Sequence, residues 1–173
     1  MTSVPSLKTQ DSAGVLVIAR STSLHPGRPV LLGQRSKNVR APFTWAPWGG
    51  RLNHAEAPEQ GAVREFREES GYRGSIELMP ESHWEYRCGV GPVNLFTFHN
   101  FIGLVEDQFA SNFDRWEVAD AKWFSLEEID ELPGPGWSWG GEPGGIHRGL
   151  RAYLRQRRIR SLVTDLLRTA DSK

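Results

Sequence analysis

Three glutamates lie close together in the stretch from residue 50 to residue 72, which reads GRLNHAEAPEQGAVREFREESGY. Glu65, Glu68 and Glu69 would share one side of a helix, because residues three or four apart lie on the same helical face. Like charges four residues apart destabilise a helix by about 0.2–0.5 kcal/mol. A hard divalent cation, which binds carboxylate oxygens, would turn this repulsion into a binding site. The spacing therefore predicts a metal site, and a solvated helix face is the alternative interpretation.

A helix from Pro58 to Gly71 is the element expected to carry these acids. Proline suits the first helical position, and glycine suits the left-handed residue that ends a helix. Arg64 precedes Glu68 by four residues, a spacing at which an ion pair can fix the glutamate side chain. Gly50, preceded by another glycine, lets the backbone approach a ligand and offers carbonyl oxygens to a metal.

The same stretch resembles the signature of the Nudix hydrolases, G-x5-E-x7-R-E-U-x-E-E-x-G-U, in which U is a bulky apolar residue. Its fixed positions are all filled, by Gly50, Glu56, Arg64, Glu65, Glu68, Glu69 and Gly71. Phe66 and Tyr72 take the apolar positions and are aromatic where an aliphatic residue is usual. The order of strands and helices indicates a mixed α+β or α/β fold. The resemblance implies the α/β/α sandwich of that family, with a mixed β-sheet between helices.

The resemblance also implies a reaction, the hydrolysis of a nucleoside diphosphate linked to another group. Magnesium is the implied metal, and manganese can substitute for it. A metal neutralises the phosphate charge that repels the attacking water and lowers the pKa of a bound water. The implied ligands are Gly50, Glu65, Glu68 and Glu69. Glu56 is implied as a supporting acid, and Arg64 as the residue that orients a glutamate.

A further acid in this family commonly precedes a late strand and serves as a metal ligand or general base. Glu117 stands six residues before Trp123, a spacing that many members share, so it is preferred to Asp114 and Asp120. Glu65 remains the alternative base, because a base needs only hydrogen-bond reach of the attacking water. The number of metal ions is left open.

Candidate substrate contacts lie before the glycines and in a late loop. A polyphosphate needs cations as well as a metal, and three cations precede the acidic site: Arg35, Lys37 and Arg40. A solvated loop is the alternative. Trp48 could stack on a nucleobase, although core packing is favoured. Trp137 and Trp139 lie in the glycine-rich segment 132–145 and could stack on a base or pin a surface loop.

Markers of family subgroups leave the substrate open. The proline typical of ADP-ribose hydrolases is absent near residues 86–88, and Tyr86 lies early for the tyrosine of dinucleoside polyphosphate hydrolases. By elimination we expect a nucleoside or deoxynucleoside triphosphate, with ADP-ribose, nucleotide sugars, dinucleoside polyphosphates and capped RNA as alternatives. A non-catalytic nucleotide- or RNA-binding domain is the alternative of another class, disfavoured because every signature glutamate is present. An isopentenyl-diphosphate isomerase is disfavoured because Cys88 lacks the required context.

Composition indicates one domain of 13–170, after a loose tail of 1–12, within the 173 residues. No apolar run is long enough for a membrane span, no secretory signal begins the chain, and Cys88 is the single cysteine. We therefore expect a cytoplasmic monomer or homodimer with no membrane partner. Residues 145–173 carry eight basic and two acidic side chains. Such a segment could contact RNA, but a basic helix docked on the sheet is favoured.

Alternating and continuous apolar runs predict the remaining elements. Strands are expected at Ala13–Arg20, Pro29–Gln34, Ser75–Met79, Trp84–Cys88, Val93–Val105 and Ala121–Ser125. Residues 25–28 should close a hairpin between the first two strands, and Val93–Val105 should be the longest and central strand. Ser125 and Glu128 have capping-box spacing for a short helix, and 146–170 should form one or two helices.

Overall fold

The computed structural model of this chain describes residues 11–90, 93–134 and 142–170. The predicted N-terminal tail lies almost wholly outside these residues, and Trp137 and Trp139 lie outside them entirely. None of the helices in the described ranges is long and apolar enough to cross a membrane.

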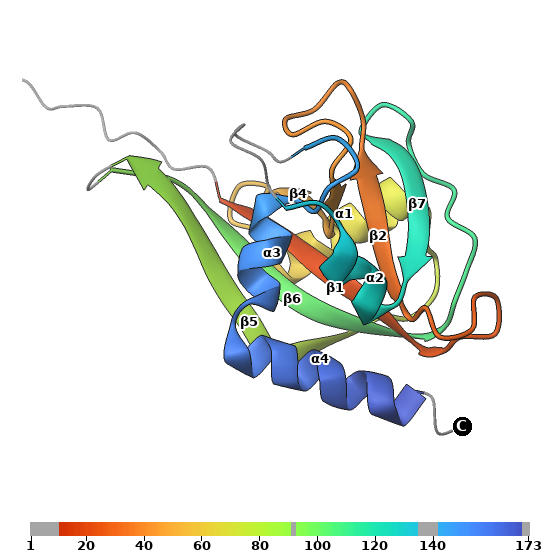
Figure 1. Cartoon of the computed structure of the whole chain (residues 1–173). Coiled ribbons are helices and arrows are strands. Elements are labelled where there is room, and N and C mark those ends of the chain that lie inside the picture. The colour runs from red at the N-terminus through yellow and green to blue at the C-terminus, as the bar shows by residue number, and fades with distance from the viewer. Residues whose placement is uncertain (1–10, 91–92, 135–141, 171–173) are drawn as a thin grey trace, which may run out of the picture.

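A mixed sheet of seven strands forms the middle of the molecule (Figure 1). Its strands are β1 (Ser12–Ser21), β2 (Val30–Arg35), β3 (Trp45–Ala46), β4 (Trp48–Arg51), β5 (Glu77–Val90), β6 (Val93–Asp107) and β7 (Val118–Phe124). The main order is β3-β2-β1-β6-β5, while β4 pairs with β1 and β7 pairs with β2. Strand β1 runs parallel to β6 and antiparallel to β2 and β4, so the predicted mixed sheet is confirmed.

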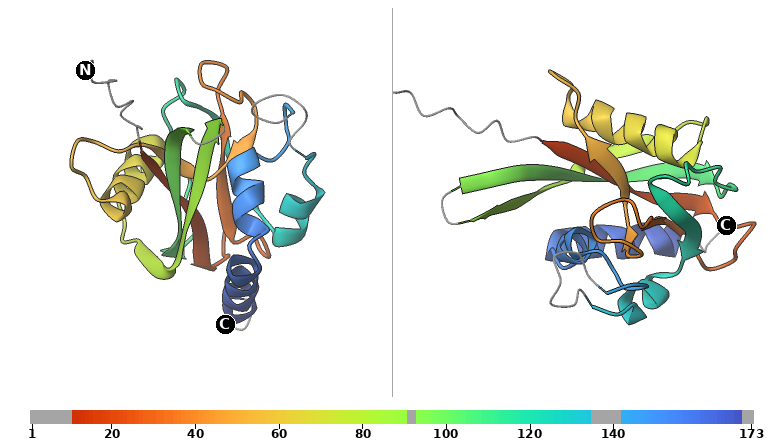
Figure 2. Two further views of the ribbon diagram at one scale, coloured as in Figure 1. Left: turned by 90° about the vertical axis from the view of Figure 1, so that its left-hand side faces the viewer. Right: turned by 90° about the horizontal axis from the view of Figure 1, so that it is seen from above.

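Helices cover both faces of this sheet, as Figure 2 shows. They are α1 (Pro58–Ser70), α2 (Leu126–Glu131), α3 (Arg148–Leu154) and α4 (Arg157–Ala170). Helix α1 covers one face, and the C-terminal pair α3 and α4 covers the other. Because successive side chains of a strand point to opposite faces, β1 supplies Leu16 and Ile18 to the core under α3 and α4, and Val15 and Val17 to the core under α1.

Most predicted elements are confirmed. The hairpin between β1 and β2 is present, and β6 is an interior strand that lies between β1 and β5. Ser125 and Glu128 form both bonds of the capping box of α2. The basic C-terminal segment forms two helices, and α4 docks on the sheet through Ile159 and Val163, both 0% exposed.

The prediction of two short strands around residues 80–82 is wrong, because one strand, β5, runs through this segment. The pairing with β6 shifts register between Met79 and Trp84. The Ser82 hydroxyl fills the gap in the ladder, donating to the Met79 carbonyl at 2.5 Å and accepting from the Ile102 N–H at 2.7 Å. A bulge of this kind tolerates proline, whose missing N–H would break a regular ladder. The Ser82 carbonyl also accepts the hydroxyl of Tyr153 on α3 at 2.7 Å.

Candidate functional site

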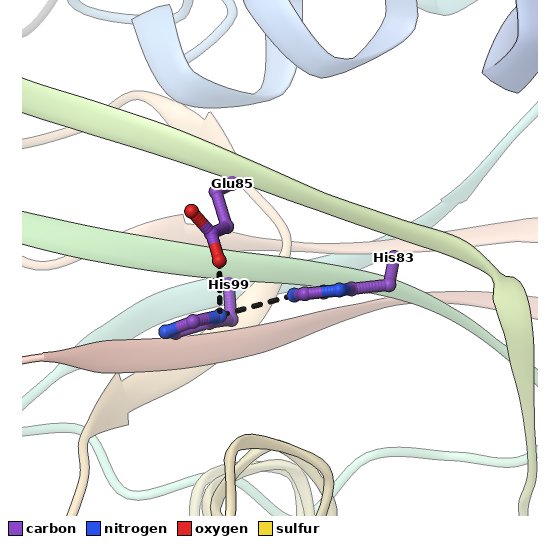
Figure 3. Close-up of side chains that lie close together, drawn as sticks. All are labelled: His83, Glu85 and His99. Atoms are coloured by element: carbon purple, nitrogen blue, oxygen red, sulfur yellow. Dashed lines mark hydrogen bonds and ion pairs between the residues drawn. The ribbon is translucent and has the colours of Figure 1, made fainter.

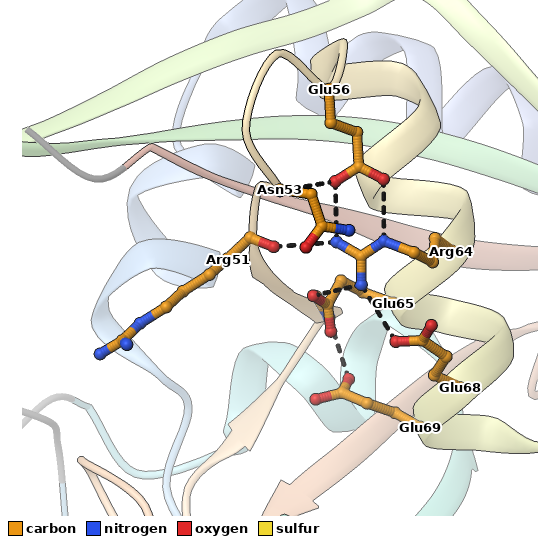
Figure 4. A network of polar contacts seen from close by, with 8 residues as sticks. Arg51, Asn53, Glu56, Arg64, Glu65, Glu68 and Glu69 are labelled. Carbon is orange, nitrogen blue, oxygen red and sulfur yellow. Dashed lines mark hydrogen bonds and ion pairs between the residues drawn. The ribbon is translucent and has the colours of Figure 1, made fainter.

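Helix α1 presents acids on one side and packs on the sheet with the other. Phe66 and Ala62 are fully buried against the sheet, and Gly71 ends the helix with φ 72°, as predicted. The Gly71 N–H donates to the Arg67 carbonyl at 3.1 Å. Because the apolar face packs on the sheet, the orientation of α1 about its own axis is fixed. Glu65 and Glu69 therefore point toward one another beside β4 (Figure 4).

The guanidinium of Arg64 joins three carboxylates (Figure 4). Its Nε and one Nη donate to the two oxygens of Glu56, each at 2.8 Å. The other Nη donates to Glu65 at 2.8 Å and to Glu68 at 3.0 Å. A further bond of 2.9 Å reaches the Arg51 carbonyl. The predicted pair with Glu68 is therefore present, and the pairs with Glu56 and Glu65 add to it.

Glu56 faces Arg64 and acts on the other acids through it. The bonds from Arg64, with a further bond of 2.9 Å from the Asn53 N–H, lower the pKa of the Glu56 carboxyl to about 2. Glu56 is therefore ionised at neutral pH. The pair has fork-to-fork geometry, which fixes the plane of the guanidinium.

The carboxyl groups of Glu65, Glu69 and Glu117 form a cluster in which negative charges repel one another. Burial raises the pKa of Glu69 well above its ordinary value, and a hydrogen bond and charge from Glu117 raise it further. The Gly49 N–H opposes this by donating to Glu69 at 3.1 Å. Burial also raises the pKa of Glu65, to which the charge of Glu117 contributes. A cluster in which each negative charge disfavours the next is suited to a divalent cation.

The backbone at Gly50 lies against this cluster. A Cβ atom at Gly50 would stand 2.6 Å from a carboxylate oxygen of Glu65, closer than two such atoms can approach. Glycine at this position therefore leaves room for the Glu65 carboxylate, which a Cβ atom would displace. The possible ligand atoms here are oxygens, which magnesium and manganese prefer. The residues therefore fit the metal that the family resemblance implies.

The loop before β7 brings Glu117 to Glu69 from a distant part of the sequence. The Asp114 N–H donates to the Glu69 carbonyl at 3.3 Å, and the Ser36 N–H donates to the Glu117 carbonyl at 2.8 Å. The other two acids considered are occupied locally. The Asp114 carboxylate accepts the N–H of residue 116 at 2.9 Å, and that of Asp120 accepts the N–H of residue 121 at 2.8 Å. Among these three acids, Glu117 is the one that acts electrostatically on both Glu65 and Glu69.

Arg35 is the one of the three predicted cations that the structure brings to the acids. Burial lowers the pKa of Arg35, while the charges of Glu69 and Glu117 oppose this shift. Its Nε donates to the Arg40 carbonyl at 2.6 Å, which orients the side chain. Lys37 and Arg40 are exposed, and within the described residues neither side chain pairs with a glutamate of the cluster.

Trp48 lies in the core, so its prediction as a substrate contact is wrong. The indole is 1% exposed and meets the Phe66 ring edge-on at a centroid distance of 6.1 Å. It also covers the space above Gly33. Strand alternation explains this, because Trp48 points from β4 toward α1 and away from solvent.

Two residues, one near Arg35 and one next to Glu117 in the sequence, were missed by sequence reasoning. His147 caps α3, accepting the Gly149 N–H at its Nδ1 at 3.1 Å. Burial lowers the pKa of His147 to about 4, and the nearby charge of Arg35 contributes, so the ring is neutral with its proton on Nε2. Trp116 is 64% exposed and precedes Glu117 directly. That adjacency was the available signal for Trp116, whereas His147 reaches Arg35 only through the tertiary fold.

The chain is similar to a protein-family model and to several solved structures. The family model described as NUDIX domain matches residues 8–143. A solved structure of a Nudix hydrolase from M. smegmatis, RenU, has a TM-score of 0.65 at 24% identity, over 91% of this chain and 87% of that one. A C. elegans Ap4A hydrolase binary complex has a TM-score of 0.64 at 17% identity, over 90% of this chain and 98% of that one.

A curated protein also matches part of the sequence. The m7GpppN-mRNA hydrolase dcap-2 of Caenorhabditis elegans is 30% identical over 94 residues, which is 50% of this chain. The matched region is 12% of the length of that relative. Both solved structures are less than 25% identical to this chain, so they show a shared fold only. The region matched by the family model includes the glutamates, Arg64 and Glu117.

Proposed function

The chain belongs to the Nudix family of pyrophosphohydrolases, which act on nucleoside diphosphate derivatives, and we propose that it hydrolyses a nucleoside or deoxynucleoside triphosphate with Mg²⁺. The meeting of Glu65, Glu69 and Glu117 beside Arg35 carries this proposal. A polyphosphate needs oxygen ligands for its metal and a cation for its own charge, and this site combines the two.

Glu65, Glu68 and Glu69 are the proposed metal ligands, together with the backbone at Gly50. The metal would neutralise phosphate charge and acidify a bound water, with Mn²⁺ able to replace Mg²⁺. Arg64 would hold Glu65 and Glu68 in the orientation for binding, because its fork fixes both at once. Glu56 would in turn hold Arg64.

Glu117 is the proposed general base. One oxygen of its rival, Glu65, already accepts a hydrogen bond from Arg64 at 2.8 Å, so that oxygen is less available to a water molecule. Glu117 is exposed, so a water molecule has access to it, and its backbone is held by Ser36. A base must reach the attacking water by a hydrogen bond, and this position at the open edge of the cluster allows that.

Substrate contacts are proposed for Arg35, His147 and Trp116. Arg35 would bind a phosphate oxygen, and the Nε2–H of His147 would donate a neutral hydrogen bond beside it. Trp116 would provide an exposed indole on which a nucleobase can stack, in place of Trp48. We further propose that the protein is cytoplasmic and acts on a small nucleotide, as a monomer or homodimer.

Hydrolysis of capped RNA is a second candidate, favoured by one observation. The curated relative with 30% identity is named an mRNA cap hydrolase. The arginines of α4 would offer an RNA chain a basic surface on the face of the sheet opposite α1 (Figure 2). A short free nucleotide would not need that surface.

A panel of nucleotides, incubated with the protein and Mg²⁺ in H₂¹⁸O, tests the proposal. We expect turnover of triphosphates, and the ¹⁸O label in the products, read by mass, locates the attacked phosphorus. Glu69→Gln is the matched inactive variant, since its amide can still accept the Gly49 N–H. Preference for capped RNA over every triphosphate would favour the second candidate, and equal turnover by Glu69→Gln would contradict the assigned site.

A further inference from the structure

Two histidines and a glutamate meet on the ribbon formed by β5 and β6 (Figure 3). The ladder places Glu85 opposite His99, and His83 precedes Glu85 by two residues, so all three side chains share one face of the sheet. His83 Nε2 lies 3.0 Å from His99 Nδ1, and a Glu85 oxygen lies 3.9 Å from the same Nδ1. His83 and His99 are 16 residues apart in the sequence, and the register of the two strands brings them together.

We propose that His83, Glu85 and His99 bind one transition-metal ion of the Zn²⁺ class, at a site separate from the glutamate cluster of α1. The possible ligand atoms lie within 4.8 Å of one another. Two ligands bound at about 2.1 Å from one zinc ion can stand at most about 4.2 Å apart. The two separations of 3.0 Å and 3.9 Å already satisfy this limit. The third pair, His83 and Glu85, lies within 4.8 Å, so rotation of the Glu85 carboxylate would complete the set.

The ligand types select the metal. Imidazole nitrogens favour Zn²⁺, Cu²⁺, Ni²⁺ and Co²⁺, whereas Mg²⁺ prefers oxygen. The glutamate cluster on α1 offers oxygens and is expected to take Mg²⁺ or Mn²⁺. The two sites therefore differ in the metal that each prefers, and excess Mg²⁺ should not displace Zn²⁺ from the histidines. Three protein ligands would leave one tetrahedral position open to solvent or to a further ligand.

Neighbouring residues hold these ligands in place before any metal binds. Arg87 donates twice to one oxygen of Glu85, at 3.1 Å and 2.7 Å, and so turns the other oxygen toward His99. The His83 ring is nearly parallel to the rings of Phe101, at a centroid distance of 4.8 Å, and of His99, at 5.3 Å. Phe101 is 1% exposed, so it gives the His83 ring a rigid support. Such supporting contacts reduce the ordering that a ligand must undergo on binding.

Two further acids lie near this group of ligands. Asp11, before β1, and Glu59, in the first turn of α1, are close enough for their charges to act on His99. With Glu85 they make three acids around two imidazoles. All three ligand side chains are partly exposed, so an ion can enter without unfolding of the ribbon.

A hydrogen-bonded pair of histidines is the competing interpretation of the same distances. One neutral ring donating to the other accounts for the 3.0 Å separation. It does not require Glu85 to face the pair, and it predicts no affinity for metal. Titration of the full-length protein with Zn²⁺ alone therefore separates the two interpretations.

The titration is done by calorimetry in millimolar Mg²⁺, which keeps the glutamate cluster occupied. We expect one Zn²⁺ per chain that Mg²⁺ does not displace. Affinity should be more than about 100-fold weaker in His83→Gln and in His99→Gln, since loss of a residue that only supports a ligand already costs about 10- to 100-fold. Glu85→Gln should weaken binding in the same direction. His25→Gln is the matched control, since His25 is exposed in the turn between β1 and β2, and its affinity should equal that of the wild type. With Cu²⁺ in place of Zn²⁺, electron paramagnetic resonance of the wild type should show coupling to two nitrogens.

Unfolding curves recorded without metal identify any variant that has lost its fold, and the Cu²⁺ spectrum of the wild type decides the question independently of variants. Absence of Zn²⁺ binding by the wild type would overturn the proposal. It would also be overturned by binding that survives in both folded histidine variants, or by binding that is lost in Glu69→Gln but kept in His99→Gln. A Cu²⁺ spectrum without nitrogen coupling would have the same meaning.

Discussion

Replacement of Arg64 by lysine separates orientation of the glutamates from simple charge. Lysine keeps the positive charge, but one ammonium group cannot reproduce the fork that binds Glu56, Glu65 and Glu68 together. If Arg64 orients metal ligands, the Mg²⁺ concentration for half-maximal rate should rise about 10- to 100-fold, as for other residues that support ligands. Excess Mg²⁺ should restore most of the rate, because the ligands themselves remain.

Stability should change by an amount between the values for exposed and buried ion pairs. The Arg64 side chain is 25% exposed, and Glu65 is 14% exposed. Exposed pairs contribute about 0.2–1 kcal/mol, and loss of one partner from a fully buried pair costs about 3–5 kcal/mol. We therefore expect Arg64→Ala to lower the free energy of unfolding by about 2 kcal/mol, measured in denaturant with a chelator present. Arg64→Lys should lower it by about half as much.

Arg67→Lys is the matched control, one helical turn further on α1. Arg67 is exposed, and its recorded side-chain bond is a long one of 3.4 Å to the Gly74 carbonyl. Both measurements should match the wild type. The reasoning would be refuted if Arg64→Lys needed no more Mg²⁺ than the wild type while Arg64→Ala needed less. That result would mean that Arg64 acts as a competing cation and orients nothing.

Three further outcomes are expected. Arg35→Gln should raise KM about tenfold or more with little change in kcat, while Lys37→Gln changes KM less than about twofold; equal effects would return Arg35 to a structural role. Glu117→Gln should lower kcat about 10²- to 10⁴-fold at saturating Mg²⁺, and rescue by excess Mg²⁺ would instead make it a ligand. The folded pKa of Glu56 lies below its ordinary value, so its pair with Arg64 stabilises the fold above about pH 4.5 and ceases to do so as the pH falls toward 2. Thermal unfolding should show the difference between wild type and Glu56→Gln shrinking over that interval, and a constant difference would contradict the shift.

Sequence reasoning succeeded where the physical signal is local. Pro58 and Gly71 mark the ends of α1 by their own backbone preferences, and the four-residue spacing of Arg64 and Glu68 guarantees that they are neighbours. The choice of Glu117 came from the resemblance to a family, and the structure brings that side chain to Glu69.

Features that depend on tertiary contacts could not be predicted in this way. Register between strands brings His83 to His99, and the contact of a late loop with β3 brings His147 near Arg35. Trp48 was ambiguous because a tryptophan beside a glycine-rich strand serves equally well in a core or in a binding site. Only the direction of its side chain decides, and this direction depends on where β4 pairs.

The Ile102 N–H donates to the hydroxyl of Ser82, where a regular ladder would offer a backbone carbonyl. This N–H is protected from solvent by a side chain, although Ile102 lies in the middle of an interior strand. Its rate of hydrogen–deuterium exchange should therefore report on the bulge, while the amides beside it report on the ladder. Because the Ser82 carbonyl also binds Tyr153, release of α3 from the sheet should accelerate exchange at Ile102 before the neighbouring amides. A single amide in β6 would thus record whether the C-terminal helices are docked.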